Sequence, residues 1–312
     1  MIQRTATNPM RFAKRLAFTS SARVGWRLIL EGIRFQEGES MLLPAYVGIT
    51  DREGSGIIDP IQATHTPYTL YPLDDHLRPN LDQLESMMKT GRHPLLLAVH
   101  YFGIVHVDLL KLRELCERYQ TLLIEDCAHI PWPLYNNTGP GSVGHAAFYS
   151  LHKSIAVPTG GILRVNDPNM TLPEPSGADR CAYACLEQFL RTDMVSAANE
   201  RRDNYQWLAN RLANIDGLTV LYPDSEQLVP HDFPIVVHDG LREKLYFKLM
   251  EEDLPTIALY YRLIEAITAE EFPASHALSK SILTLPIHQD TDQADLERLT
   301  DRLITILEEL RA

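Results

Sequence analysis

Two patterns of hydrophobic and polar residues, continuous apolar runs and helical spacing, alternate along the first half of the chain. Continuous apolar runs at 93–103 (HPLLLAVHYFG) and 121–129 (TLLIEDCAH) are typical of strands buried on both faces. The segment between them, 106–120, has apolar residues at helical spacing. Strand, helix and strand in this order predict a sheet dominated by parallel strands, with helices on both of its faces.

Neighbouring segments continue this α/β pattern. A helix is predicted at 21–33 and a strand at 40–46, ahead of the two apolar runs. After the runs, 144–153 and 160–167 are predicted as two further strands. Ligands of such open sheets bind at the carboxyl ends of the strands, so we expect the functional residues where these segments end.

The pattern changes after residue 178. Residues 178–215 are typical of a long helix with a break near Thr192–Asp193. Short strands are then predicted at 218–224, 233–239, 255–261 and 281–288, and helices at 241–253 and 293–312. We therefore predict two domains, a large α/β domain at 1–180 and, at 181–312, a linking helix with a small α+β domain.

Charge and composition narrow the range of functions. The chain has 312 residues, with 29 Lys and Arg against 41 Asp and Glu, a net charge of −12. This balance argues against a nucleic-acid partner and gives no reason to expect a membrane partner. No apolar run reaches the length of a membrane span. The basic stretch at 1–15 resembles a transit peptide, but we predict a cytoplasmic protein, because the fold already uses the residues that follow it.

The cysteines give no sign of a metal centre. Cys116, Cys127, Cys181 and Cys185 include no C-x-x-C pair. Cys181 and Cys185 are spaced for one helix face, but no His or Cys lies near them in sequence, so no metal site is predicted. Structural thiols in a reducing compartment are the expectation.

Two charged residues follow buried strands. Asp126 comes directly after TLLIE, and Lys153 lies just past the strand that ends in AAFYS. A buried carboxylate without a partner is costly, and burial makes the amine of a lysine available as a nucleophile. Taken singly, Asp126 could be a turn cap or an ion-pair partner, and Lys153 a surface lysine with a buried stem.

Together the two residues match the needs of pyridoxal phosphate. That cofactor requires a lysine for a Schiff base and an acid that holds its pyridine nitrogen protonated. It also requires a grip on its phosphate, for which the start of a helix is suited. Ser20 and Ser21 open a predicted helix, and Ser150 offers a further hydroxyl, although each serine could serve as a cap instead.

Further motifs follow one another in a recognisable order. They are FTSSARVGW (18–26), MLLPAY (41–46), LLLAVHYFG (95–103), LIEDCAH (123–129), FYSLHKSIAVPTGG (148–161) and FPASHALSKSILTLPIHQDTDQADLERLTDRL (272–303). Their order and spacing resemble the DegT/DnrJ/EryC1/StrS family of aminotransferases, along nearly all of the chain. The resemblance implies the fold type I scaffold of pyridoxal-phosphate enzymes: a seven-stranded, mostly parallel sheet with helices on both faces, a small α+β C-terminal domain, and a homodimer.

The resemblance also implies roles for individual residues. Lys153 matches the Schiff-base lysine, which later moves the proton between substrate and cofactor. Asp126 matches the partner of the pyridine nitrogen. His129 stands where the family usually has Gln or another polar group near the cofactor, and Ser150 and His152 lie in the lysine block beside it.

The chain departs from the family at several positions. Ala22 and Arg23 replace the usual Gly-Thr of the phosphate loop, and Arg23 could grip phosphate as a bidentate donor or bind a substrate anion. The aromatic residue that normally stacks on the cofactor falls near Gly48, which leaves Tyr46 as the stacking candidate or as core filling. The glycines at 160–161 are expected to let the backbone approach cofactor or substrate.

The predicted reaction moves an amino group from an amino acid donor, glutamate by family analogy, to a keto acceptor. The family suggests a keto sugar, often linked to a nucleotide. The chain is shorter than most family members, and part of the missing length falls where many relatives bind that nucleotide. Candidate substrate residues from the tail are Tyr260, Tyr261, Arg262 and His288.

Two other hypotheses stay open at this stage. Some relatives are sugar dehydratases that carry histidine in place of the lysine; here His152 lies beside a retained Lys153, which favours amino transfer. A catalytically idle binding or regulatory protein would explain the altered phosphate loop and the short tail. The retained Asp126 and Lys153 argue against that reading, because a protein without catalysis has no need of this costly pair.

Overall fold

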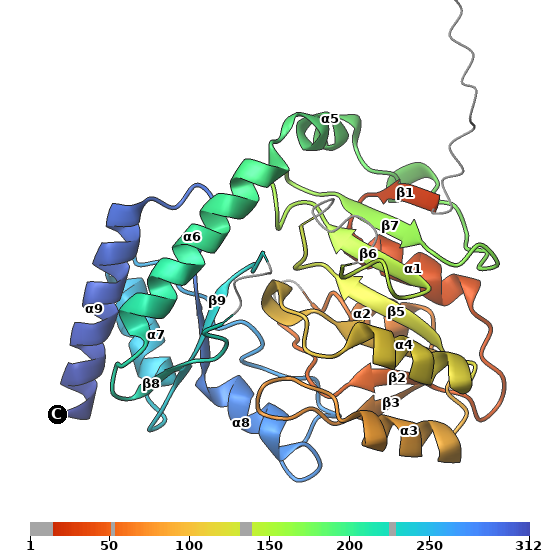
Figure 1. The fold of residues 1–312 in the computed structure, drawn as a ribbon, viewed down its shortest axis with the longest axis horizontal. Coiled ribbons are helices and arrows are strands. Elements are labelled where there is room, and N and C mark those ends of the chain that lie inside the picture. The colour runs from red at the N-terminus through yellow and green to blue at the C-terminus, as the bar shows by residue number, and fades with distance from the viewer. Residues whose placement is uncertain (1–14, 51–53, 132–138, 225–228) are drawn as a thin grey trace, which may run out of the picture.

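A large sheet of seven strands organises the first part of the molecule (Figure 1). The computed structural model describes residues 15–50, 54–131, 139–224 and 229–312. The order across the sheet is β1 (Arg15–Thr19), β7 (Gly161–Val165), β6 (Ala146–Ser150), β5 (Leu122–Cys127), β4 (Leu95–Val99), β2 (Met41–Pro44) and β3 (Tyr68–Tyr71). Strands β3, β2, β4, β5 and β6 are parallel, whereas β7 runs antiparallel to both of its neighbours. The prediction of a mostly parallel sheet is confirmed.

Helices cover both faces of this sheet, because successive strand residues point to opposite sides. The helices are α1 (Ala22–Gly32), α2 (Ile58–Ala63), α3 (Leu81–Thr90) and α4 (Leu109–Arg118). The apolar residues of α1 and α2 share one buried cluster with Leu43, Leu97 and Phe148. Those of α3 and α4 share another with Leu42 and Leu96, on the opposite face. This two-faced burial explains why β4 and β5 lack alternation.

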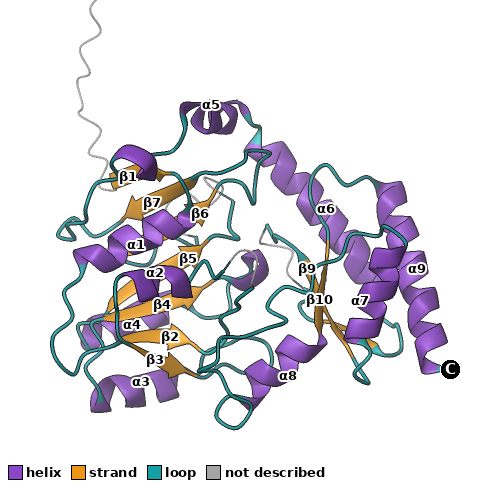
Figure 2. Cartoon of the chain, turned by 180° about the vertical axis from the view of Figure 1, so that it is seen from behind, coloured by secondary structure: helices purple, strands orange, loops and turns teal. Residues whose placement is uncertain are grey.

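A second, antiparallel sheet forms the tail, with the strand order β10 (Ile282–Leu285), β9 (Phe233–Val237) and β8 (Leu218–Val220). The helices that follow β7 in the chain are η2 (Gly177–Asp179), α5 (Tyr183–Arg191), α6 (Met194–Leu212), α7 (Arg242–Glu251), α8 (Pro273–Ser281) and α9 (Gln293–Arg311). Figure 2 shows α6, α7 and α9 on the side of this sheet that faces away from the large sheet. Their apolar faces share one buried cluster with the strands.

The predicted helix break near Thr192–Asp193 is confirmed. Helix α5 ends at Arg191, and Asp193 caps α6 by accepting hydrogen bonds from the backbone N–H groups of Val195 and Ser196. The domain boundary predicted at residue 180 stays a prediction. Among the described residues, no helix is both long and apolar enough to span a membrane. The basic segment predicted at the N-terminus lies almost wholly outside the described residues.

The strand predicted at 255–261 is wrong. In this segment Ile257 makes an isolated bridge to Thr284 of β10, and the rest forms a loop. Tyr260 has φ of 61°, in the left-handed region, which breaks an extended run. The apolar spacing that suggested a strand instead reflects side chains that turn toward different neighbours, as described below.

Candidate active site

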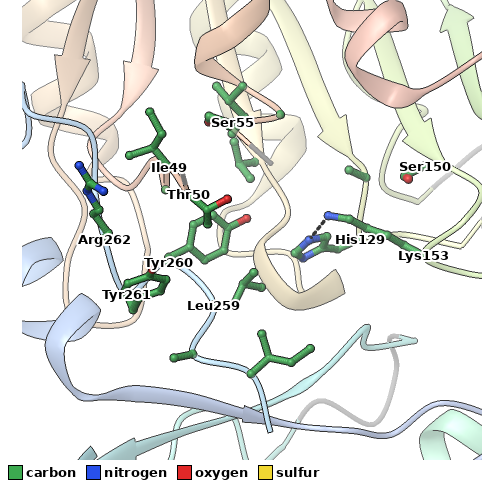
Figure 3. A pocket seen from close by; sticks show the side chains of 18 of the residues that line it. Ile49, Thr50, Ser55, His129, Ser150, Lys153, Leu259, Tyr260, Tyr261 and Arg262 are labelled. Atoms are coloured by element: carbon green, nitrogen blue, oxygen red, sulfur yellow. Dashed lines mark hydrogen bonds between the residues drawn. The ribbon is translucent and has the colours of Figure 1, made fainter. Parts of the chain in front are cut away.

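A cavity of about 860 Å³ opens at the carboxyl ends of β5 and β6 (Figure 3). The first turn of α1, the segment that follows β2, and the tail segment 257–262 also line it. Figure 3 shows Tyr260 and Tyr261 across the cavity from Lys153 and His129. The sequence-predicted residues that line the cavity are Ser21, Ala22, Arg23, Asp126, His129, Ser150, His152, Lys153, Tyr260, Tyr261 and Arg262.

Asp126 is the last residue but one of β5, where the parallel strand delivers it to the cavity edge. The carboxylate is buried, and its Oδ1 accepts a hydrogen bond from the backbone N–H of Ala128 at 2.8 Å. Burial raises the pKa of Asp126, while that hydrogen bond and the charge of Lys153 act in the opposite direction. A buried acid therefore faces the cavity with a cation nearby.

Lys153 lies in a tight turn after β6 and is half-buried. Its Nζ is 2.7 Å from His129 Nε2, the contact drawn in Figure 3. The backbone N–H of Phe102 donates to the other ring nitrogen, His129 Nδ1, at 3.1 Å. Burial, and then the charge of Lys153, hold the pKa of His129 well below its usual value. Because Nδ1 accepts from Phe102, the neutral ring has its N–H on Nε2, which donates to Nζ of Lys153 when that amine is uncharged.

Arg201 anchors the turn that presents Lys153, a role that sequence reasoning missed. The side chain reaches in from α6 and is buried, and burial lowers its pKa to about 10. Its Nη2 donates to the backbone carbonyl of Lys153 at 3.2 Å, and its Nε donates to Gln289 at 2.8 Å. A long helix with mixed polarity gives no signal that one arginine points inward, so the sequence could not have singled it out.

Two more buried groups lie near this amine and were also missed. The ring of His231 is 4.6 Å from that of His129, measured between centroids. Burial raises the pKa of Asp232 to about 6, although Lys153 and Arg201 counter it. Both residues come from the segment that leads into β9, so the tail contributes buried titratable groups close enough to feel the charge of Lys153.

The start of α1 forms the end of the cavity that suits an anion. Ser21 is the N-cap, and its hydroxyl accepts a hydrogen bond from the backbone N–H of Val24 at 3.3 Å. Ala22 and Arg23 complete the first turn and line the cavity. The helix dipole and its terminal N–H groups favour negative charge at this point. Arg23 forms an ion pair with Asp59 at 3.2 Å.

The paired glycines do something other than predicted. They do not line the cavity, and they instead bring the start of β7 against the N-terminus of α1. The backbone N–H of Gly160 donates to the carbonyl of Ser20 at 2.8 Å. A Cβ on Gly161 would come within 2.4 Å of the carbonyl carbon of Ser21, so no larger residue fits.

A buried carboxylate next to Asp126 supports the site from behind. Glu125 points to the opposite face of β5, where it accepts hydrogen bonds from His100 Nε2 at 2.9 Å and from backbone N–H groups at 141, 143 and 144. Burial alone would raise the pKa of Glu125, but the hydrogen bond and charge of His100 bring it below the ordinary value. His100, Glu125 and Cys127 are close enough for a metal, yet both carboxylate oxygens already have donors.

Three predicted site residues lie away from the cavity lining. Ser20 uses its backbone carbonyl to hold Gly160 and the side chain of Thr159. Tyr46 is fully buried, with its ring against Tyr260. His288 is absent from the lining, and its backbone carbonyl accepts a hydrogen bond from Asn204 of α6 at 3.3 Å. Their assigned contacts with cofactor or substrate are not supported by these positions.

The mouth of the cavity includes residues of α7 that sequence reasoning did not single out. They are Arg242, Glu243, Tyr246 and Phe247. Phe247 and Ile257, which also lines the cavity, are more than half exposed, at 55% and 56%. An amphipathic pattern places such residues on a helix but cannot say that the helix borders a cavity.

Comparison with known proteins adds evolutionary evidence to this geometry. A curated relative, the dTDP-3-amino-3,6-dideoxy-alpha-D-galactopyranose transaminase of Aneurinibacillus thermoaerophilus, is 24% identical over 254 residues, which cover 71% of this chain and 68% of the relative. Among solved structures, the aminotransferase TlmJ from Streptoalloteichus hindustanus has a TM-score of 0.75 at 20% identity, covering 95% of this chain and 87% of that one.

A further solved structure, Helicobacter pylori PseC, described as an aminotransferase involved in the biosynthesis of pseudoaminic acid, has a TM-score of 0.77 at 14% identity, with the same coverage of both chains. At such identities the structural likeness establishes the fold. The DegT/DnrJ/EryC1/StrS aminotransferase family matches residues 66–172 and 179–304, which include Asp126 and Lys153. The resemblance inferred from the motifs is thus confirmed, and the chain belongs to the DegT/DnrJ/EryC1/StrS aminotransferase family.

Proposed function

We propose that this protein is a pyridoxal-phosphate-dependent aminotransferase that passes an amino group from an amino acid to a keto sugar. The observation that carries the proposal is the meeting of three groups in one cavity. Asp126, Lys153 and the first turn of α1 reach it from separate elements. They match the pyridine nitrogen, the aldehyde and the phosphate of that cofactor, in this order.

The residues present fit the cofactor. Burial disfavours the charged form of Asp126. A protonated ring nitrogen bound beside this carboxylate would give the charge a partner. The helix start offers a hydroxyl and backbone N–H groups to a phosphate, as in other phosphate sites. Bound there, pyridoxal phosphate would supply an electron sink for the carbon that loses or gains a proton.

The chain's own side chains divide the remaining work. Lys153 would hold the cofactor through Nζ and then, once released by the donor, move a proton at that nitrogen. His129, with its proton on Nε2, lies against the same atom and would orient it. Arg201 fixes the backbone of the turn, so that Nζ stays within reach of the cavity.

The substrates are inferred at a coarser level. Family analogy supports glutamate as the donor, and the dTDP-sugar transaminase among the relatives supports a keto sugar as the acceptor. Tyr261 and Arg262, which line the mouth, are proposed to contact the acceptor. The homodimer and the cytoplasmic location predicted from the sequence stay predictions.

Absorption spectroscopy tests the proposal. Purified protein is mixed with pyridoxal phosphate, and the near-ultraviolet and visible spectrum is recorded before and after glutamate, beside Lys153→Ala. We expect a band that requires Lys153 and that changes to the pyridoxamine form with glutamate. A keto-sugar acceptor should then restore the first spectrum.

Other outcomes contradict the proposal in different ways. A band that glutamate and other amino acids leave unchanged would rule out amino transfer and favour another reaction, such as sugar dehydration. Folded protein without any band would support the idle binding protein instead. Lys153→Arg is a matched control, because it keeps the positive charge but cannot form the bond to the aldehyde.

A further inference from the structure

The tail segment 257–264 is tied to both sheets. At its start, Ile257 and Thr284 of β10 exchange backbone hydrogen bonds of 3.0 and 2.8 Å. At its end, the N–H of Ile49 donates to the carbonyl of Arg262 at 3.0 Å, and the N–H of Ile264 donates to Val47 at 3.0 Å. The segment thus bridges the small sheet and the chain that follows β2.

Tyr260 lies midway along this bridge in an uncommon conformation. Its φ of 61° is in the left-handed region, which a bulky side chain rarely adopts and which costs free energy. The surroundings hold it there: its ring lies 5.2 Å from that of Tyr46, 5.6 Å from Tyr101 and 6.2 Å from Phe102, between centroids. These rings pack against part of the phenol, while its remaining surface lines the cavity.

Gly48 shows why the ring can stand at this place. A Cβ on Gly48 would come within 2.6 Å of Tyr260 Cδ1 and 3.3 Å of its Cα. The space that a side chain at position 48 would fill is therefore taken by Tyr260. The same position is where the family resemblance leads one to expect the aromatic residue that stacks on the cofactor.

The ring is also placed toward the acid of the site. Among the causes that raise the pKa of Tyr260, burial comes first and the charge of Asp126 second. The phenol is therefore neutral at physiological pH. Figure 3 shows Tyr260 facing Lys153 and His129 from the opposite wall of the cavity. Tyr46, in contrast, lies behind Tyr260 and is fully buried.

From this geometry we infer that Tyr260 supplies the aromatic ring that packs on the cofactor, from the tail segment, in place of a side chain at position 48. The inference rests on the proposed function. Because Tyr260 belongs to the tail segment 257–264, binding of pyridoxal phosphate should stabilise the docked position of this segment. The docked segment should in turn raise the affinity for the cofactor.

Dissociation constants for pyridoxal phosphate, measured by titrating the Lys153-dependent band, test this inference. Tyr260→Leu keeps bulk but loses the ring, and we expect cofactor affinity to fall about tenfold. Tyr260→Phe keeps the ring and should bind within about twofold of the wild type, because the contact is through the face of the ring. Far-ultraviolet circular dichroism of each apoprotein checks that it is folded.

A double variant provides a matched rescue. Gly48→Phe alone should bind the cofactor poorly, because the new ring and Tyr260 compete for one space. Tyr260→Gly alone removes the ring and fits the left-handed backbone. Gly48→Phe combined with Tyr260→Gly returns a ring to the same place, and we expect its dissociation constant to lie within about threefold of the wild type.

A measurement on the unaltered protein guards against variants that fail to fold. Hydrogen exchange of peptide 257–264 should slow when pyridoxal phosphate is added, since its ring would restrain Tyr260. Unchanged exchange, or a Tyr260→Leu protein that binds as tightly as the wild type, would overturn the inference while leaving the proposed function intact. A wild-type protein without a Lys153-dependent band would overturn the proposed function itself, and this inference with it.

Discussion

The two walls of the cavity are built by different means. The strand wall, formed by Asp126, His129 and Lys153, lies at the ends of parallel strands whose pattern is strong in the sequence. The tail wall, formed by Leu259–Arg262, is a loop that belongs to no helix or strand, and its Tyr260 has left-handed backbone.

The two walls therefore divide the work: one holds the groups proposed to react, and the other surrounds what binds in the cavity. The strand wall carries the groups assigned to the proposed reaction, and Asp126 and the Lys153–His129 pair are each held by a partly buried hydrogen bond. The tail wall carries aromatic and cationic side chains that touch whatever fills the cavity. A rigid sheet can thus keep the reaction constant while a loop adapts the contacts around it.

The largest effect is expected for Asp126→Asn on the strand wall. The substitution keeps an acceptor for Ala128 but cannot hold a ring nitrogen protonated, so the rate of amino transfer should fall by about 10³-fold. The apoprotein should become more stable by about 1 kcal/mol, because burial disfavours the charge of Asp126. Steady-state kinetics and urea unfolding measure the two quantities, and an apoprotein that loses stability would contradict the second.

Gly161→Ala should damage the contact beneath the anion end of the cavity. The added Cβ would lie 2.4 Å from the carbonyl carbon of Ser21, so either α1 or β7 must shift. We expect a loss of about 3 kcal/mol in the free energy of unfolding. Gly56→Ala is the control, since its Cβ meets nothing within 4 Å, and it should change stability by less than about 0.5 kcal/mol. Equal effects of the two variants would contradict the structure at this contact.

We expect the buried ring of His106, which lies behind the tail wall, to make the stability of the protein depend on pH. Its ring is buried against Tyr101 and Tyr222, and burial lowers the pKa of His106 to about 3. The unfolded chain binds this proton below about pH 6.5 and the folded protein does not, so the group costs stability as pH falls from 6.5 toward 3. His106→Gln should reduce the slope by about 1.4 kcal/mol per pH unit near pH 5.

Urea unfolding between about pH 4.5 and 7.5 measures that slope. A His106→Gln curve parallel to the wild-type curve would mean that the ring accepts a proton within the fold.

Arg23→Ala should have the smallest effect. The ion pair with Asp59 is partly exposed, at 44% and 34%, and such pairs contribute less than about 1 kcal/mol. We expect stability to change by less than about 0.5 kcal/mol and the dissociation constant of pyridoxal phosphate to rise only about threefold. Spectral titration and thermal unfolding check both. A loss of affinity above about a hundredfold would show that Arg23 leaves Asp59 and binds the phosphate directly.

Sequence reasoning recovered the strand wall because its signals are local. Buried parallel strands appear as apolar runs, and Asp126 and Lys153 are placed by the ends of those runs. The helix break at Asp193 was likewise visible, because a cap residue interrupts the helical spacing.

The tail wall could not be recovered in the same way. Proximity in sequence to position 48 indicates Tyr46 as the stacking residue, but Tyr260 occupies that space from a distant part of the chain. The apolar spacing of 255–261 fits a strand as well as it fits the observed loop, and it does not indicate the positive φ of Tyr260. Long-range packing decides such positions, and periodicity carries no information about it.

The contact of Ser21 with Gly160 has a consequence for how the protein is made. The bridge joins distant parts of the chain, so the anion end of the cavity cannot form until β7 has been synthesised and has paired with its neighbours. A nascent chain that ends before residue 160 contains Asp126 and Lys153 yet lacks the support of the α1 terminus. Under the proposed function, capture of the cofactor phosphate would therefore be a late event in folding, after β1 and β7 have paired.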